Sequence, residues 1–349
     1  MAKGKENVKK ITSIGGSALI EGIMMRGPKK TMVAVRTENK GIYTEELEFS
    51  GLGAKHKILR MPFIRGLVGL IDSMRLSYKA LMISANKAIE DVPEDDEPSK
   101  FEKWIDKVFG EKFMNVLMVI ASVLGVALAI GLFFVLPTWL YNASTGALGQ
   151  ANGSLAWLTD DRFTRSVFEG VLRIILFLAY VVACSQMSDM KRVFQYHGAE
   201  HKTIFCYESE EELTVENVRK HTRFHPRCGT SFLVIMLLIG IIIGLFVPFT
   251  NPFLRSAVKI LLLPVSCGIG YELIKICGKY DNLATRIIAA PGLWAQRITT
   301  KEPDDSMIEI AIAAMKPVIP ENGEDIIGGK AVEDEQPIEK QVSNTTEGV

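Results

Sequence analysis

The stretch that decides the fold runs from Phe113 to Leu136 and reads FMNVLMVIASVLGVALAIGLFFVL. It contains no charged side chain. A helix of this length is about 36 Å long, and the hydrocarbon core of a bilayer is about 30 Å thick. The stretch therefore predicts a membrane-spanning helix, from which the rest of the chain can be interpreted.

Three more apolar segments follow, so the sequence predicts an α-helical polytopic membrane protein with about four transmembrane helices. Two of these segments carry charged residues and are also compatible with buried helices of a soluble domain. Short loops connect both of them to the clearer spans, which favours a position in the membrane. The spans are expected at residues 113–136, 167–187, 231–247 and 260–276.

Charged residues lie inside two of the predicted spans. Glu169 and Arg173 are four residues apart, share a helix face, and are expected to pair. Glu272 lies in the last span. Charges at this depth often mark ion or solute pathways, so a transporter is a third possible function. The spans show no inverted repeat, which argues against a secondary transporter.

Lysine and arginine are distributed unevenly about these spans. Of the 40 such residues, 35 lie before residue 113, in the loop 188–230, or after residue 274. Basic residues collect on the cytoplasmic side, so we expect both termini and this loop in the cytoplasm. Five cysteines at irregular spacing exclude a disulfide-stapled secreted domain. The zero net charge and the 8% of aromatic residues argue against a nucleic-acid partner.

The segment before the first span divides into three parts. Residues 1–60 are expected to form a small β-rich cytoplasmic unit, because Thr31–Arg36 has strand composition and a turn precedes a second such run. Residues 61–90 predict a basic amphipathic helix, which would lie on the inner leaflet or pack on the β unit. Residues 91–112 predict an acidic linker and a pre-membrane helix.

The chain after the last span returns to the membrane surface and then changes character. Residues 305–316 can form one helix. The composition beyond Pro317 is acidic and polar, so the segment 301–349 is expected to be a largely disordered tail.

The loop 188–230 contains four of the five histidines. The string His197-Gly-Ala-Glu200-His201 is an H-x-x-E-H motif, in which two histidines share one face of a helix and can bind one metal ion. His225 and Cys228 follow at a spacing that suits a divalent metal such as zinc. We therefore expect a metal site in this loop, with Glu200 as the catalytic acid or base.

Other interpretations remain open at this stage. Short motifs arise by chance, and histidines near a bilayer can simply titrate beside anionic lipid headgroups. Glu208 lies about 16 Å from His197 along a continuous helix, so it can join the site only if the chain bends. Glu21 and Arg26, in the glycine-rich N-terminal motif, are possible substrate contacts or a turn-stabilising pair.

Five strings of the sequence resemble domain-of-unknown-function family 1385, the YqhQ-like bacterial membrane proteins described as predicted metal-dependent enzymes. The resemblance covers residues 11–300. It implies a multi-span protein of the bacterial inner membrane, with the same histidines and cysteine as its candidate site. His221 lies at the edge of these strings and ranks lower as a ligand. The strings are GGSALIEGIMMRGP (15–28), RMPFIRGLVGLIDSM (60–74), YHGAEHKTIFCYE (196–208), LTVENVRKH (213–221) and HPRCGTSFL (225–233).

These observations lead to two main hypotheses for the function. The first is a zinc-dependent hydrolase at the cytoplasmic leaflet that acts on a lipid or membrane-protein substrate. The alternative is a non-catalytic membrane scaffold or assembly factor with a structural metal site. A coordination position left open beside a pocket would favour the enzyme, and a closed four-ligand site would favour the scaffold.

Overall fold

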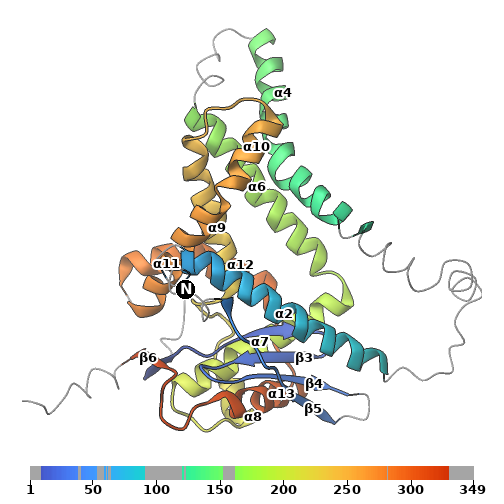
Figure 1. Ribbon diagram of the computed structural model, residues 1–349, viewed down its shortest axis with the longest axis vertical. Coiled ribbons are helices and arrows are strands. Elements are labelled where there is room, and N and C mark those ends of the chain that lie inside the picture. Colours follow the sequence, from blue (N-terminus) through green and yellow to red (C-terminus); the bar gives the residue numbers. More distant parts are fainter. Residues whose placement is uncertain are drawn as a thin grey trace, which may run out of the picture.

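A tall bundle of helices stands on a compact base built around a β-sheet, as Figure 1 shows. The predicted linker 91–112, the start of the first predicted span and the tail after residue 329 lie outside the described residues. The computed structural model describes residues 9–37, 41–52, 59, 61, 64–90, 120–121, 123–151, 162–280 and 282–329.

The N-terminal β-rich unit is a four-stranded antiparallel meander in the order β2-β3-β4-β5. A two-residue turn joins the first two strands, and its second residue, Glu21, has a φ of 49°. The strands predicted at residues 31–36 and after residue 41 are both present. Their bounds are Gly15–Leu19 (β2), Gly22–Arg26 (β3), Thr31–Arg36 (β4) and Ile42–Glu46 (β5).

Helices cover both faces of this sheet. Helices α7 (Ser188–Glu208) and α13 (Asp305–Met315) pack on one face, where Ile23 and Met25 enter the core. Helix α2 (Ile64–Glu90) packs on the other face, where Met24 is buried. This alternation along β3 is the period-2 pattern of a strand buried on both sides.

The predicted boundary at residue 300 does not end the folded part of the chain. Helix α13 is buried on nearly every side because its apolar residues surround the helix. Strand β6 (Ile326–Gly329) then pairs antiparallel with β1 (Lys10–Thr12), so the two ends of the described chain lie together. We call β1–β6, α7, α8 (Val215–Lys220) and α13 the α/β unit.

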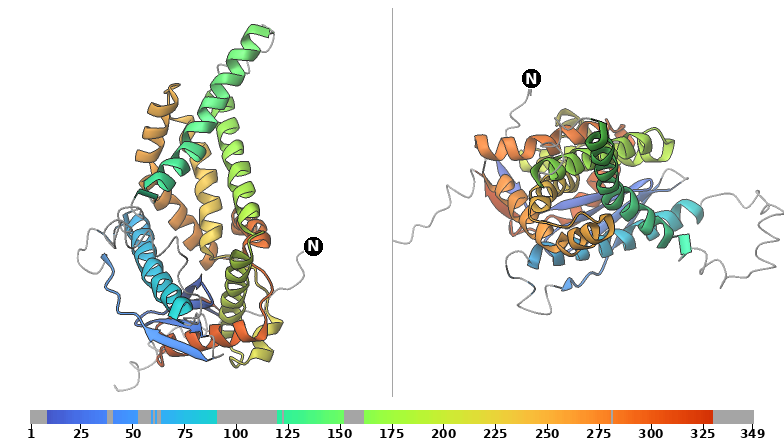
Figure 2. Two further views of the ribbon diagram at one scale, coloured as in Figure 1. Left: turned by 90° about the vertical axis from the view of Figure 1, so that its right-hand side faces the viewer. Right: turned by 90° about the horizontal axis from the view of Figure 1, so that it is seen from above.

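The other helices form the helical bundle, which rises from the α/β unit in the left view of Figure 2 and lies over it in the right view, which looks down from above. Helix α7 lies directly below α6 in the left view and enters the α/β unit. The bundle consists of η2 (Gly131–Val135) with α4 (Leu136–Ala151), α6 (Arg162–Cys184), α9 (Gly229–Leu245), α10 (Pro252–Leu261), α11 (Leu263–Lys279) and α12 (Leu283–Thr299).

Two helices among the described residues are long and apolar enough to cross a membrane, Val123–Gly146 and Arg162–Cys184. The pair α10 and α11 is bent by 47° and gives a third if it forms one span. Helix α9, predicted as a full span, has 17 residues and is about 25 Å long, short of the bilayer core. The described residues therefore support two or three spans, and the arrangement of four spans stays a prediction.

The ion pairs in the bundle differ from the expected pair of Glu169 with Arg173. Glu169 forms ion pairs with Arg255 and Lys259 of α10 rather than with Arg173. The Arg173 Nε donates instead to the carbonyl of Phe133, at 2.7 Å. Helix α10 returns alongside α6 and therefore brings Arg255 and Lys259 to Glu169. The four-residue spacing on α6 predicts Arg173 as the partner of Glu169 instead.

Helix α2 packs on the β unit, which is one of the two positions that its amphipathic sequence predicts. Leu76 and Ala80 are buried against the sheet. Arg65, near the helix start, forms a bidentate ion pair with Glu272 of α11, with N–O distances of 2.8 and 2.6 Å. Met74 and Tyr78 are exposed, so the helix also presents an apolar surface outward.

Candidate metal centre

Helix α7 carries the histidine motif, and the second half of this helix is buried in the α/β unit. Gly198 permits a close crossing there, because a Cβ at this position would lie 2.0 Å from the carbonyl oxygen of Lys301. The chain that leaves α12 therefore runs directly over α7. This crossing brings the carbonyl of Thr299 to the neighbouring His197.

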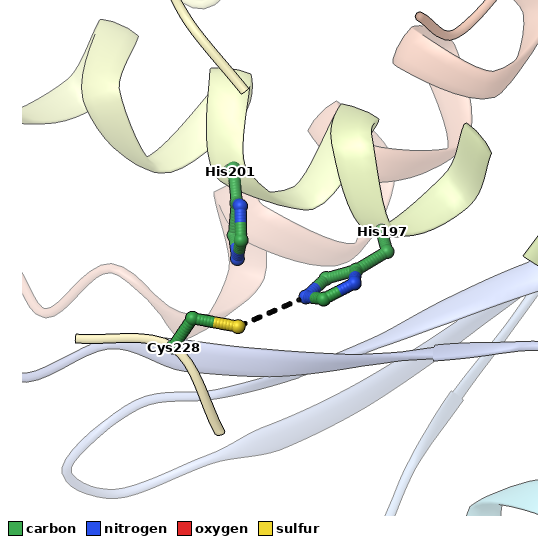
Figure 3. Close-up of side chains that lie close together, drawn as sticks. All are labelled: His197, His201 and Cys228. Carbon is green, nitrogen blue, oxygen red and sulfur yellow. Dashed lines mark hydrogen bonds between the residues drawn. The ribbon is translucent and has the colours of Figure 1, made fainter. Parts of the chain in front are cut away.

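His197, His201 and Cys228 converge on one point (Figure 3). Each offers one ligand atom, and these atoms all lie within 4.8 Å of one another. The Nε2 of His197 is 3.1 Å from the Sγ of Cys228. Nitrogen and sulfur ligands of a tetrahedral zinc ion are about 3.5 Å apart, so small shifts would fit these side chains to the metal.

The opposite ring nitrogens of both histidines are held by backbone carbonyls. The Nδ1 of His197 lies 2.9 Å from the oxygen of Thr299, and that of His201 lies 2.6 Å from the oxygen of Arg223. Metal-binding histidines are usually oriented in this way, by a hydrogen bond from the nitrogen that does not bind the metal. The donor set therefore fits a metal ion, with Nε2 of each ring directed at Cys228.

His225 lies next to this cluster but outside the group of three. Its ring centroid is 5.4 Å from that of His201, while its Nε2 lies 3.1 Å from the guanidinium Nη2 of Arg227. The side-chain amide of Gln296 binds both the backbone N–H and the carbonyl of His225, at 2.8 and 2.7 Å. Burial lowers the pKa of His225 to about 4, so this ring is neutral at pH 7.

Glu208 lies behind His225 at the end of α7. The helix is continuous from His197 to Glu208, so the bend that would bring this carboxylate to the metal group does not occur. Glu208 instead pairs with Arg227 and accepts a hydrogen bond from the backbone N–H of Thr12 at 2.8 Å. Burial raises the pKa of Glu208, but His225 and Arg227 lower it by more than burial raises it. The net pKa therefore falls below the ordinary glutamate value.

Glu200 is the carboxylate closest in sequence to the donor set, and it is 6% exposed. Its Oε2 has no hydrogen-bond partner among the described residues. Burial raises its pKa above the ordinary glutamate value, and the attraction of His197 and His201 only partly opposes this. A buried carboxyl with a raised pKa and a spare oxygen is suited to proton transfer.

The glycine-rich N-terminal motif forms one wall of this site. A Cβ at Gly16 of β2 would lie 2.9 Å from the carboxyl carbon of Glu200 and 2.7 Å from the carbonyl oxygen of Met24. The backbone of Gly16 also hydrogen-bonds to the Glu200 carboxylate, which moderates the rise in its pKa. The absence of a side chain at Gly16 thus lets the strand approach the carboxyl closely.

Glu21 and Arg26, the expected substrate contacts, lie outside the cluster. The guanidinium of Arg192 donates to the Glu21 carboxylate, and the hydroxyl of Tyr196 donates to its Oε2 at 3.2 Å. Arg26 is exposed at the other end of β3, with its guanidinium 5.4 Å from the ring centroid of Phe49. The two residues therefore do not pair with each other, and only Glu21 contacts α7.

Cys228 and His197 perturb each other's protonation. Burial raises the pKa of the Cys228 thiol, but His197 and His201 lower it more, and the net pKa lies well below the ordinary value. Burial lowers the pKa of His197, but the opposite effects of Cys228 and the other groups around this ring are together larger, so the net pKa rises to about 9. Cys228 is also the N-cap of α9, a position that favours a thiolate.

A family comparison identifies the wider group of this chain. The family described as "Protein of unknown function (DUF1385)" matches residues 61–321, more than half of the chain. The chain belongs to the DUF1385 family. The uncharacterized protein YqhQ of Bacillus subtilis (strain 168) is 31% identical over 311 residues, which cover 87% of this chain and 92% of that protein. No solved structure matches.

The DUF1385 match includes α7 and the segment that carries His225 and Cys228, but it begins after Gly16. Sequence reasoning about this DUF1385 chain missed Arg227, Gln296 and Thr299. The sequence did point to Arg227, because this residue lies between His225 and Cys228 in the HPRCG string. Thr299 contributes only a backbone carbonyl, which no sequence pattern reveals.

Proposed function

We propose that this DUF1385 chain is a metal-dependent hydrolase in which His197, His201 and Cys228 hold a divalent ion, zinc by the nature of the donors. The observation that carries the proposal is the buried Glu200 carboxyl, with its raised pKa and unpaired Oε2, beside three converging metal-type ligands. A set of three protein ligands is typical of catalytic rather than structural zinc sites.

When bound, such an ion supplies Lewis acidity, which polarises a carbonyl or phosphoryl oxygen and acidifies water. The residues of the chain perform the remaining tasks. Glu200 accepts a proton on Oε2 from the attacking water and returns it to the leaving group. The carbonyls of Thr299 and Arg223 keep the two imidazole rings in position.

The surroundings of the site support a membrane-associated substrate. Cys228 caps α9 (Gly229–Leu245), a helix without a charged residue, so the site lies where the α/β unit meets the helical bundle. The lysine and arginine distribution supports a cytoplasmic position in the bacterial inner membrane, with both termini inside. We therefore propose a lipid or membrane-protein substrate that is cleaved at the cytoplasmic leaflet.

The metal content of detergent-purified protein tests the ligand assignment. We expect the double variant His197→Ala/His201→Ala to lose one metal ion per chain relative to wild type. His225→Gln is the matched control and should retain that ion, because its Nε2 faces Arg227. Loss of the ion in His225→Gln would indicate a closed four-ligand site and favour the scaffold hypothesis. Unchanged metal in the double variant would exclude the proposal.

A second candidate is a cysteine hydrolase, favoured by the 3.1 Å contact of His197 with a Cys228 thiol of lowered pKa. The thiolate would attack an acyl carbon, and His197 would donate its proton to the departing group. Water would then release the acyl chain from sulfur and restore the thiol–imidazole pair. The Thr299 carbonyl would orient the imidazole, as the third member of a triad does.

A chelator distinguishes the two candidates. Hydrolysis of fluorogenic phospholipid and peptide probes should stop on chelation and return with zinc if the metal mechanism holds, and Glu200→Gln should be inactive with its metal retained. If chelated protein stays active and alkylation of Cys228 stops the reaction, the cysteine mechanism is correct.

A further inference from the structure

A second group of metal-type ligands lies at the far end of α7. Cys206, Glu211 and His221 each offer one ligand atom, and these three atoms lie within 4.8 Å of one another. The Nε2 of His221 is 3.5 Å from the Oε2 of Glu211. A nitrogen and an oxygen bound to the same tetrahedral zinc ion are about 3.3 Å apart, so this pair is already close to ligand spacing.

The local backbone explains how three segments meet there. Cys206 lies in the last turn of α7, and Glu210 then adopts a left-handed conformation with a φ of 58°. This turn sends the chain back, so that the N–H of Glu211 donates to the carbonyl of Cys206 at 3.2 Å. Thr214 caps the short helix α8, and His221 is the residue at which α8 ends.

The ordinary interpretation accounts for only part of this group. A His–Glu ion pair explains Glu211 and His221 but not the thiol within 4.8 Å of both. Cys206 is fully buried, and its Sγ lies 3.6 Å from the carbonyl of Glu212, which is a weak hydrogen bond. A metal–thiolate bond would replace that weak bond and release the thiol proton.

We propose that Cys206, Glu211 and His221 form a second metal centre, which binds a borderline-soft divalent ion such as zinc. Sulfur, nitrogen and carboxylate oxygen from one side chain each are all zinc ligands. Glu211 is partly exposed, with 45% of its side chain accessible, so water can complete the coordination. The proposal does not depend on the function proposed for the first centre.

The two centres are separate. His201 and Cys206 are five residues apart on α7, about 7.5 Å along the helix axis and on different faces. Paired catalytic metals lie only about 3.5–4 Å apart, so these would not act as one binuclear centre. The second ion would instead fasten α8 to the end of α7, the helix that presents Glu200 and both histidines of the first centre.

Metal counting on the full-length chain in detergent, loaded with zinc under reducing conditions, tests the proposal. We expect about two zinc ions per chain in wild type, since each centre holds one. Cys206→Ser and His221→Ala should each remove one ion, and His197→Ala/His201→Ala should remove the other. Cys277→Ser is the matched control, because its thiol lies in neither group, and it should keep both.

Two further measurements distinguish the loss of a metal ligand from misfolding of the variant. Glu211→Gln alters a partly exposed side chain, so it should lower zinc occupancy without disturbing the core. In a Cys228→Ser background, cobalt substitution should still give a thiolate-to-metal charge-transfer band, and Cys206→Ser should abolish it. The proposal would be overturned if Cys206→Ser and His221→Ala had the same zinc content as wild type. The absence of that cobalt band would also overturn it. Either result leaves the His197 centre untouched.

Discussion

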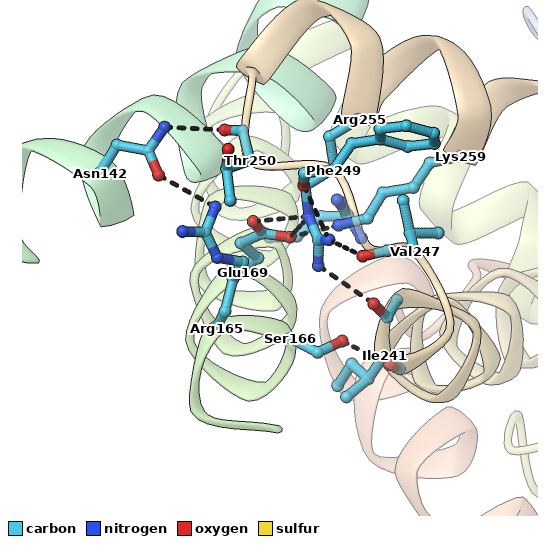
Figure 4. Close-up of polar contacts among 12 residues, drawn as sticks. Asn142, Arg165, Ser166, Glu169, Ile241, Val247, Phe249, Thr250, Arg255 and Lys259 are labelled. Atoms are coloured by element: carbon cyan, nitrogen blue, oxygen red, sulfur yellow. Dashed lines mark hydrogen bonds and ion pairs between the residues drawn. The ribbon is translucent and has the colours of Figure 1, made fainter. Parts of the chain in front are cut away.

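Two buried glutamates, one in the helical bundle and one in the α/β unit, have opposite surroundings. In the bundle, both oxygens of Glu169 are bound by cations, with Arg255 Nε at 3.0 Å from each and Lys259 Nζ on Oε2 (Figure 4). In the α/β unit, Glu200 is also buried but forms no ion pair among the described residues, and its Oε2 is unpaired. Two cations are bound to the first carboxylate, whereas among the described residues no cation forms an ion pair with the second.

The difference separates a structural carboxylate from one available for chemistry. Arg255 also donates to the carbonyl of Gly244 at 3.1 Å, so the bundle cluster ties α6 and α10 to the end of α9. Every group there has a fixed partner and cannot exchange a proton at low cost. Glu200 has one oxygen free to take up a proton, beside the ligands of the candidate metal centre.

The largest effect is expected at Glu169. Glu169→Gln leaves Arg255 and Lys259 buried without a countercharge, and loss of one partner of a buried ion pair costs about 3–5 kcal/mol. Thermal unfolding in detergent should show a large decrease in stability or a failure to fold. Glu272→Gln is the graded control, because its pair with Arg65 is partly exposed and should contribute about 1 kcal/mol or less. Equal stability of both variants would remove the distinction between the two glutamates.

A smaller effect is expected from Gly16→Ala, which tests the close approach of β2 to Glu200. The added Cβ would press on both the Met24 carbonyl and the Glu200 carboxyl, and overpacking of this kind costs about 1–3 kcal/mol. We expect lower stability together with loss of hydrolysis. Gly15→Ala is the matched control, since a Cβ there meets nothing within 4 Å. If the two variants behave alike, the glycine-rich motif is not a wall of the site.

The smallest effect on stability, and of opposite sign to the first, is expected from Glu200→Gln. The neutral amide removes the penalty of a buried charge, so the chelated variant should be more stable than chelated wild type at neutral pH, by on the order of 1 kcal/mol. The folded pKa of Glu200 lies above its unfolded value near 4.5. Wild type therefore loses stability as pH rises from about 4.5 through the raised pKa, and the variant lacks this slope.

Denaturant unfolding measured across this pH range gives the comparison directly. The gap between Glu200→Gln and wild type should widen as pH rises. A gap that is constant with pH would show that the Glu200 carboxylate is already compensated in the folded chain, as Glu169 is.

Local patterns predicted much of this architecture. The strand at residues 31–36 and the helix at 305–316 follow from composition and apolar periodicity. The H-x-x-E-H string placed His197, Glu200 and His201 on one helix, because residues three and four apart share a face. Arithmetic on the length of that helix also kept Glu208 away from the metal group.

Long-range packing decided what local patterns could not. The partner of Glu169 comes from α10, about ninety residues away along the chain, so no spacing rule identifies it. His225 matches the ligand type and spacing, but Gln296 and Arg227 hold it in a different role. The tail after residue 300 looked polar on average, while the buried residues of α13 occupy only a short part of it.

The pairing of β1 with β6 has a consequence for how the protein is made. The first strand precedes every bundle helix and the last follows all of them, so the ribosome has released all of these helices before β1 finds its partner. The carbonyl that orients His197 likewise comes from residue 299. Every helix of the bundle is therefore synthesised before the candidate centre can assemble, and a chain that ends before residue 299 holds its histidines and cysteine without the carbonyl that orients His197.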